Sequence, residues 1–119
     1  FTGKRNDTVN FYEAADISIL CSHQEGFSNS ILEAMAAGLP MIVTNAGGNA
    51  EAVHNKINGF VVDIQDVEGL SKAIDILLQS KKIRYSQGKK SREIIKKNFR
   101  IEKCILQYEQ FYEKFIIFK

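Results

Sequence analysis

The first two thirds of the chain alternate short apolar runs with segments of helical spacing. Three runs bounded by polar or turn residues are typical of buried strands: 17–21, 41–44 and 60–63. Residues 30–37 are strong helix formers that stop at Gly38, with Pro40 just beyond, and a short helix is expected at about 50–54. Strands and helices that alternate at this pitch predict βαβ units and a parallel sheet.

From Asp66 onward the apolar residues are spaced as in helices, and no further strand is predicted. Apolar residues after it predict one helix, a basic helix is expected over about 82–97, and apolar steps of four and three predict a last helix over 101–118. A further helix is expected to start at Asp7, before the first strand. We therefore predict an α/β fold, a Rossmann-like parallel sheet with flanking helices, that ends in three helices.

Length and composition bound the class of protein. A chain of 119 residues with 45% hydrophobic residues and one proline predicts a single domain with its own core, residues 1–119. No apolar run is long enough to span a membrane and residues 1–10 do not resemble a signal peptide, so a cytoplasmic location is expected. Cys21 and Cys104 have neither disulfide nor zinc spacing and are expected to be buried, reduced thiols.

Basic residues are concentrated between Lys81 and Lys103. This segment has ten of them against Glu93 and Glu102, a local charge of +8, so the rest of the chain carries −6. Such a block fits either an anionic surface at the inner face of the membrane or a solvated helix face, and both interpretations stay open. Nucleic acid is not expected as a partner, because the segment has no interleaved aromatic residues and no nucleic-acid motif.

Candidate chemistry lies between the first strand and the helix at 30–37. Open α/β sheets bind ligands where a strand ends and a helix begins, and the free N–H groups of a helix start favour an anion such as a diphosphate. The small residues Gly26 and Ser28 let the backbone approach that anion closely. Glu25 precedes the helix and Glu33 lies about one turn inside it, so both carboxylates are expected to face hydroxyl groups in one cleft.

The segment from Glu25 to Glu33 closely resembles a motif of glycosyltransferase family 4, two glutamates separated by seven residues. Its continuation to Pro40 matches as well. Further matches follow in the same order along the chain: Phe1-Thr2-Gly3, Ala15-Asp16, Ser22, Gly47-Gly48 with Glu51, and Asn58-Gly59-Phe60. The resemblance covers residues 1 to about 78 and implies the C-terminal, donor-binding domain of a two-domain glycosyltransferase of the B type (GT-B), truncated at its N-terminal side.

The resemblance implies transfer of a sugar, with retention, from a nucleoside diphosphate sugar to an acceptor in polysaccharide or glycolipid biosynthesis. It assigns Glu25 to the donor sugar as the catalytic residue and Glu33 to the ribose hydroxyls. No metal and no cofactor are implied. The acceptor domain and the residues that bind the base and phosphates would lie before Phe1, so the chain is expected to be inactive alone.

Backbone amides are expected to complete the donor site. The resemblance implies that three of them face the sugar: Gly26, Phe27 and Ser28. Those of Asn29 and Ser30 would face the diphosphate, where they stabilise the charge that builds on the leaving group. The pair Gly47-Gly48 fits either an anion-binding nest or a tight turn, and Glu51 after it is expected to be an N-terminal helix residue.

Several of these positions also have a structural interpretation. Ser30–Glu33 fits a capping box, in which the glutamate bonds back to the first amide of the helix. Asp66–Glu68 resembles an acidic metal-binding triplet, but capping of the helix that follows is favoured. His23 and His54 have no partner at metal or nucleophile spacing, so no metal site is assigned.

Two other functions would keep the same residues. A non-catalytic nucleotide-binding or assembly module would act through the apolar last helix, and a nucleotide-sugar epimerase would need no acceptor. The apolar stripe over 101–118 is expected to pair two copies of this chain or to lie on another surface. The nucleotide base, the sugar, the acceptor and the linkage are not predicted.

Overall fold

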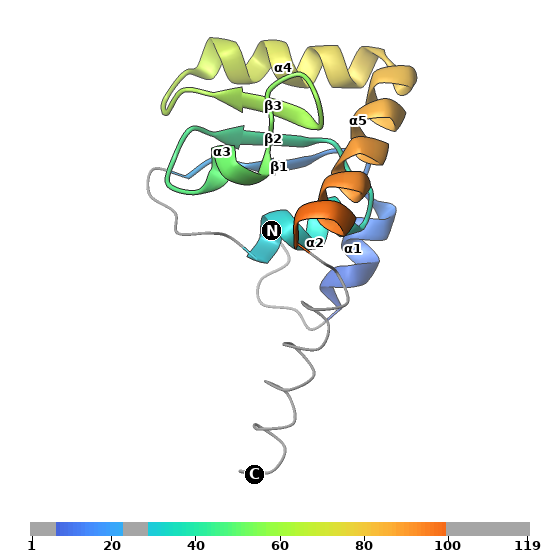
Figure 1. The fold of residues 1–119 in the computed structure, drawn as a ribbon. Helices are drawn as coiled ribbons and strands as arrows, with labels where there is room; N and C mark the ends of the chain where they lie inside the picture. The colour runs from blue at the N-terminus through green and yellow to red at the C-terminus, as the bar shows by residue number, and fades with distance from the viewer. Residues whose placement is uncertain (1–6, 23–28, 100–119) are drawn as a thin grey trace.

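The computed structural model describes residues 7–22 and 29–99 (Figure 1). Within these residues the centre is a sheet of three parallel strands in the order β1 (Ser18–Leu20), β2 (Met41–Thr44) and β3 (Gly59–Val62). A helix lies in each connection between successive strands, as parallel pairing requires. The predicted α/β class and the parallel sheet are therefore confirmed.

The central strand β2 is buried on both faces of the sheet. Met41 and Val43 pack in one apolar cluster with α2 (Asn29–Ala36), whereas Ile42 between them packs in a second cluster with α4 (Val67–Gln79). Successive side chains of a strand point to opposite faces, so a strand covered on both sides needs an unbroken apolar run. This explains why the sequence shows no polar alternation along β2.

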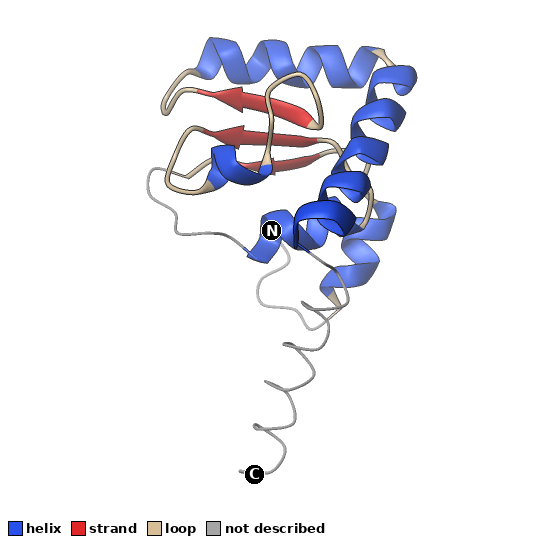
Figure 2. Cartoon of the chain, viewed as in Figure 1, coloured by secondary structure: helices blue, strands red, loops and turns tan. Residues whose placement is uncertain are grey.

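Helices cover the two faces of the sheet in separate layers (Figure 2). On one face α2 lies with α3 (Asn49–Ala52), and α4 covers the other face. The helix α1 (Thr8–Ala14) packs beside α2, where Tyr12 contacts the first cluster. Strand β1 lies at an edge of the sheet, and its Ile19 is 45% exposed.

Gly38 fixes the turn from α2 into β2. Its φ is +78°, a left-handed conformation that favours glycine, and its N–H donates to the carbonyl of Met35 at 3.0 Å. The N–H of Leu39 donates to the carbonyl of Ala34 at 3.2 Å. These two bonds form a Schellman motif, so the predicted helix stop before Pro40 is confirmed.

The helix α5 (Lys81–Ile94) crosses the amino ends of the strands and connects the two layers (Figure 1). Its inward side is small and polar. A Cβ built at Gly88 would overlap the carbonyl oxygen of Gly38, and the hydroxyl of Ser91 donates to the carbonyl of Leu39 at 2.9 Å. The backbone of α5 therefore approaches the turn after α2 as closely as a glycine allows.

Most predicted boundaries differ from the observed ones by one or two residues. The basic helix expected over 82–97 is α5 followed by a π-helical turn, η1 (Ile95–Phe99), and the helix expected at 50–54 begins at Asn49. The last helix expected over 101–118 lies outside the described residues, so its fold and its pairing stay predictions. None of the helices in the described part is long and apolar enough to cross a membrane.

Candidate functional site

The carboxyl ends of the three strands meet at one edge of the sheet (Figure 1). Because the strands are parallel, the segments that follow Leu20, Thr44 and Val62 all start at this edge. The first of these segments leads from β1 into α2 and contains the paired-glutamate motif. This edge is the candidate functional site.

Thr44 joins the first two of these segments. The N–H of Ser22 donates to the Thr44 Oγ1 at 2.9 Å, and the Thr44 hydroxyl donates back to the Ser22 carbonyl at 2.6 Å. Thr44 is buried, and a hydrogen bond shielded from water is electrostatically stronger than an exposed one. These two hydrogen bonds hold Ser22, and with it the start of the segment that leads from β1 to Glu25, against the end of β2. Sequence patterns did not indicate this role, although a threonine that closes an apolar run is a signal for it.

The loop after β2 is held by Asn49. Its Nδ2 donates to the carbonyl of Thr44 at 2.9 Å, and its backbone N–H donates to the carbonyl of Ala46 at 3.2 Å. Gly47 has a φ of +52°, and Gly48 caps the start of α3. The pair Gly47-Gly48 thus forms a tight turn into a helix, and anion binding by its amides stays a prediction.

Two buried polar atoms at this edge have no partner among the described residues. They are the Oγ of Ser22 and the Oδ1 of Asn49. Buried polar atoms in native proteins almost always have a hydrogen-bond partner. Each atom is therefore a candidate contact for a ligand or for a group outside the described ranges, and neither was predicted from the sequence.

The start of α2 places Asn29 and Ser30 in its first turn. Both residues are exposed, and the N–H groups of a first helical turn have no partner within the helix. This is the arrangement that the predicted diphosphate contact needs. The other residues predicted to bind the donor before the helix lie outside the described residues, and their roles stay predictions: Glu25, Gly26, Phe27 and Ser28.

Glu33 faces α1 and contacts Tyr12. The Tyr12 hydroxyl donates to the Glu33 carboxylate and accepts from Ser30, and burial followed by the Glu33 charge raises the pKa of the phenol above its ordinary value. The capping-box alternative is wrong, because α2 begins at Asn29 and Ser30 already lies inside it. Ribose binding by the exposed Glu33 stays a prediction, and Tyr12 is an additional residue of this region that the sequence did not indicate.

A cavity of about 200 Å³ opens at the same edge, next to α4. It is lined by the three strand ends and the start of α4: Cys21, Ser22, Thr44, Val62, residues 63–67 and Leu70. Pockets for small ligands have volumes of roughly 300–1,000 Å³, so this cavity fits part of such a ligand. None of Asn29, Ser30, Glu33 or the glycine pair lines it.

Cys21 at the rim of this cavity is exposed. The prediction of a buried thiol at this position is wrong, because β1 ends at Leu20 and Cys21 already belongs to the loop. Cys104 lies outside the described residues.

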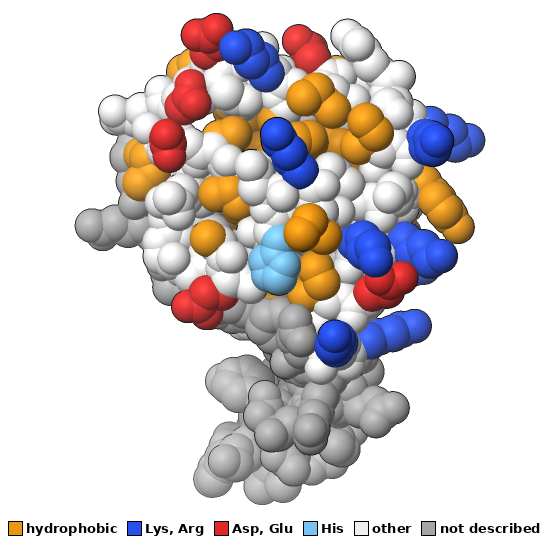
Figure 3. Space-filling view, turned by 45° about the horizontal axis from the view of Figure 1, so that its top comes forward, with side chains coloured by type: hydrophobic (Ala, Val, Ile, Leu, Met, Phe, Trp, Pro, Cys, Tyr) orange, Lys and Arg blue, Asp and Glu red, His pale blue; other side chains and the backbone are white. Residues whose placement is uncertain are grey.

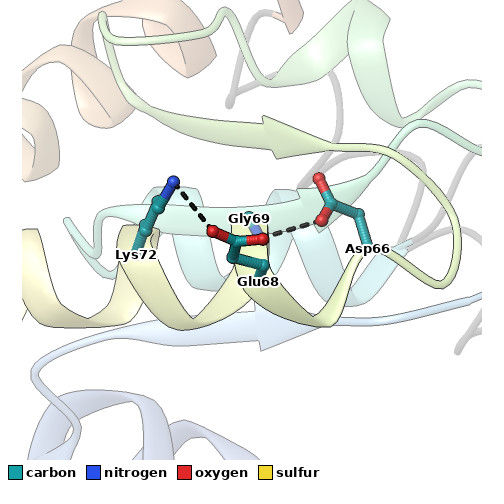
Figure 4. A network of polar contacts seen from close by, with 4 residues as sticks. All are labelled: Asp66, Glu68, Gly69 and Lys72. Atoms are coloured by element: carbon teal, nitrogen blue, oxygen red, sulfur yellow. Dashed lines mark hydrogen bonds and ion pairs between the residues drawn. The ribbon is translucent and has the colours of Figure 1, made fainter.

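The acidic triplet Asp66–Glu68 belongs to the start of α4 (Figure 4). The Asp66 Oδ1 accepts from the N–H of Gly69 at 2.9 Å, and Glu68 pairs with Lys72 at 3.2 Å, so the predicted capping role is confirmed. Glu51 lies in the first turn of α3, as predicted. Its carbonyl lies 3.3 Å from the ring Nε2 of His54, a contact within one turn of chain.

Comparison with known proteins shows which family the chain belongs to. Residues 1–98 match the sequence pattern described as "Glycosyl transferases group 1". The chain belongs to this family. The chain is 32% identical over 112 residues to N-acetyl-alpha-D-glucosaminyl L-malate synthase of Bacillus anthracis, a match that covers 94% of the chain and 29% of that protein. The predicted family is therefore confirmed.

Another relative and one solved structure extend the comparison. The chain is 32% identical over 117 residues to UDP-Gal:alpha-D-GlcNAc-diphosphoundecaprenol alpha-1,3-galactosyltransferase of Escherichia coli, a match that covers 98% of the chain and 30% of that protein. The C-terminal domain of the group 1 protein LpcC from Francisella tularensis is 30% identical, with a TM-score of 0.75, over 85% of this chain and 52% of that one. The chain thus spans about 30% of the length of the curated relatives it matches.

Proposed function

We propose that this chain is the donor-binding part of a glycosyltransferase that uses a nucleoside diphosphate sugar, with a UDP-sugar as the first candidate. Family membership supports sugar transfer, and the Escherichia coli relative is named for a UDP-galactose donor. The observation that carries the proposal is the position of the motif Glu25–Glu33. It connects the end of β1 with the first turns of α2 at the carboxyl edge of the sheet.

The proposed chemistry uses the start of α2 as an anion site. The N–H groups of Asn29 and Ser30 in the first turn and the partial positive charge of the helix would stabilise the diphosphate as it leaves the sugar. Glu25 would hold the hydroxyls of the donor sugar. Glu33 would hold the ribose, with its carboxylate oriented by the hydroxyl of Tyr12. We further propose that the transfer proceeds with retention and uses no metal.

A second domain would supply the acceptor in this proposal. The relatives are about three times as long as this chain, which leaves room for such a domain in the full-length protein. The proposed acceptor is a growing polysaccharide or a glycolipid, made on the cytoplasmic side of the membrane.

Replacement of Glu25 by Gln in the full-length protein tests the function. The amide keeps the size of the side chain but removes its charge, so we expect transfer from a UDP-sugar to fall by about 100-fold or more. The matched control is Glu51→Gln, an exposed glutamate in the first turn of α3, which should keep wild-type transfer. Thermal unfolding of both variants shows whether the fold is retained.

Three results would contradict the proposal. Sugar transfer at the wild-type rate in Glu25→Gln would show that the charge of Glu25 is not needed for the reaction. Nucleotide binding without transfer to any acceptor in the wild-type protein would favour a non-catalytic module. Conversion of the donor into an isomer without an acceptor would identify an epimerase.

A further inference from the structure

The charges of the described residues are segregated. The segment 81–99, which forms α5 and η1, contains eight basic residues and Glu93, a net charge of +7. All other described residues together have nine acidic and two basic side chains, a net charge of −7. Figure 3 shows Lys and Arg side chains gathered on the α5 side of the molecule, and Asp and Glu mainly away from it.

The outer face of α5 is lined by lysines. Lys82 and Lys89 of α5 and Lys96 of η1 recur every seven residues, which is close to two turns of an α-helix, and all three are exposed. We call these three residues the lysine face. The opposite side carries the buried Gln87, Gly88 and Ser91 of α5 and Ile95 of η1. Because the tight contacts of α5 lie on that opposite side, the lysine face is presented by a rigid support.

The lysine face has no role in holding the described fold together. In that part of the chain the lysine ion pairs are Lys72 with Glu68 and Lys90 with Glu93, and none of the three lysines of the face has a polar partner there. Both arginines of α5 contact carbonyls of the fold: Arg84 donates to Leu77 at 2.6 Å and Arg92 to Ala37 at 3.4 Å. The two guanidinium groups keep their charge but are held against backbone carbonyls, whereas the three lysines of the face are not.

Exposed apolar groups lie next to the lysine face. Tyr85, three residues after Lys82, is 74% exposed and also lines a groove toward α1 that contains Glu13 and Asp16. Leu78, near the end of α4 at the corner before α5, is 62% exposed. A tyrosine ring has an apolar body and a polar tip, which suits the boundary between headgroups and acyl chains of a bilayer.

We propose that the lysine face, with Tyr85, docks the protein on an anionic lipid bilayer. Diffuse headgroup charge attracts lysines without requiring a fixed geometry, whereas recognition of nucleic-acid phosphates favours the planar fork of arginine. The arginines of α5 already contact the fold. Since α5 crosses the amino ends of the strands, docking leaves the carboxyl edge free (Figure 1).

Vesicle binding of the full-length protein tests this proposal. Vesicles of phosphatidylcholine, with and without phosphatidylglycerol, are sedimented with wild type and with the double variant Lys89→Gln/Lys96→Gln. Each lysine near an anionic surface contributes roughly fivefold to partitioning, so the double variant should bind anionic vesicles about 25-fold more weakly. High salt should release the wild type, because screening shortens the range of surface charge.

The matched control is Lys56→Gln/Lys72→Gln, two exposed lysines outside α5 that give the same change in net charge. It should lose little binding. An equal loss in both variants, no binding of the wild type to anionic vesicles at low salt, or preference for duplex nucleic acid over vesicles would each overturn the proposal. Thermal unfolding verifies that both variants are folded, and the readout does not depend on sugar transfer.

Discussion

The two ends of the sheet are built in different ways. At the carboxyl edge, loops leave the strands and are held by side chains such as Thr44 and Asn49 that bond to backbone groups. At the amino edge, α5 packs through Gly88 and Ser91, with backbone close to backbone. Buried polar atoms without a partner among the described residues occur at both ends, Ser22 Oγ and Asn49 Oδ1 at the carboxyl edge and Gln87 Oε1 on α5. The difference is that the tightly packed helix leaves its outer face free to carry charge.

The largest effect is expected where α5 meets the turn after α2. In Gly88→Ala the added Cβ overlaps the carbonyl of Gly38, so α5 has to move away from the fold. Alanine gains about 1 kcal/mol of helix propensity, but overpacking against a backbone atom costs more, and we expect the free energy of unfolding to fall by about 2 kcal/mol. Urea denaturation measures this difference.

Ser86→Ala serves as the control for this change, because Ser86 is exposed on the same helix. It should leave the free energy of unfolding nearly unchanged. A Gly88→Ala protein as stable as the wild type would show that the close contact is not what holds α5.

The next effect is expected at the carboxyl edge. Thr44→Val keeps the shape of the side chain but removes both bonds to Ser22, and the loss should be about 1–2 kcal/mol of unfolding free energy. Because the motif segment starts after Ser22, UDP binding should weaken while vesicle binding stays at the wild-type level. Calorimetric titration with UDP and vesicle sedimentation measure the two properties separately.

Ser71→Ala, an exposed position on α4, is the control for Thr44→Val and should change neither property. Equal weakening of UDP and vesicle binding in Thr44→Val would mean that the two ends of the sheet are not independent.

The smallest effect concerns the pH dependence at Tyr12. Burial and the neighbouring Glu33 charge raise the pKa of this phenol, so the neutral form is favoured in the folded protein. Its contribution to stability is fully present below the ordinary tyrosine pKa of about 10 and is lost as the pH rises through the higher folded value. Urea denaturation between about pH 9 and pH 11 should therefore show a steeper loss for wild type than for Tyr12→Phe.

Wild type and Tyr12→Phe are compared at the same pH values, so the titration of the other groups affects both proteins alike. Identical profiles for wild type and Tyr12→Phe would remove the contact with Glu33 as the cause.

The sequence was sufficient where one local pattern has one physical solution. The apolar run 41–43, closed by Thr44, requires a strand covered on both faces, and β2 has the predicted bounds 41–44. Gly38 before Pro40 ends a helix, and Asp66 caps the next one, as predicted. The motif Glu25–Glu33 also indicated the family correctly, because its residues and their order carry that information without the fold.

The tertiary structure decided everything that depends on which distant segments meet. The contacts of Thr44 with Ser22 and of Tyr12 with Glu33 join elements separated in sequence, and no local spacing specifies them. Cys21 was expected inside a strand and lies at the rim of a cavity, because the end of β1 is set by pairing with β2. The sequence likewise shows where lysines recur along α5, but only packing through Gly88 determines that their face points outward.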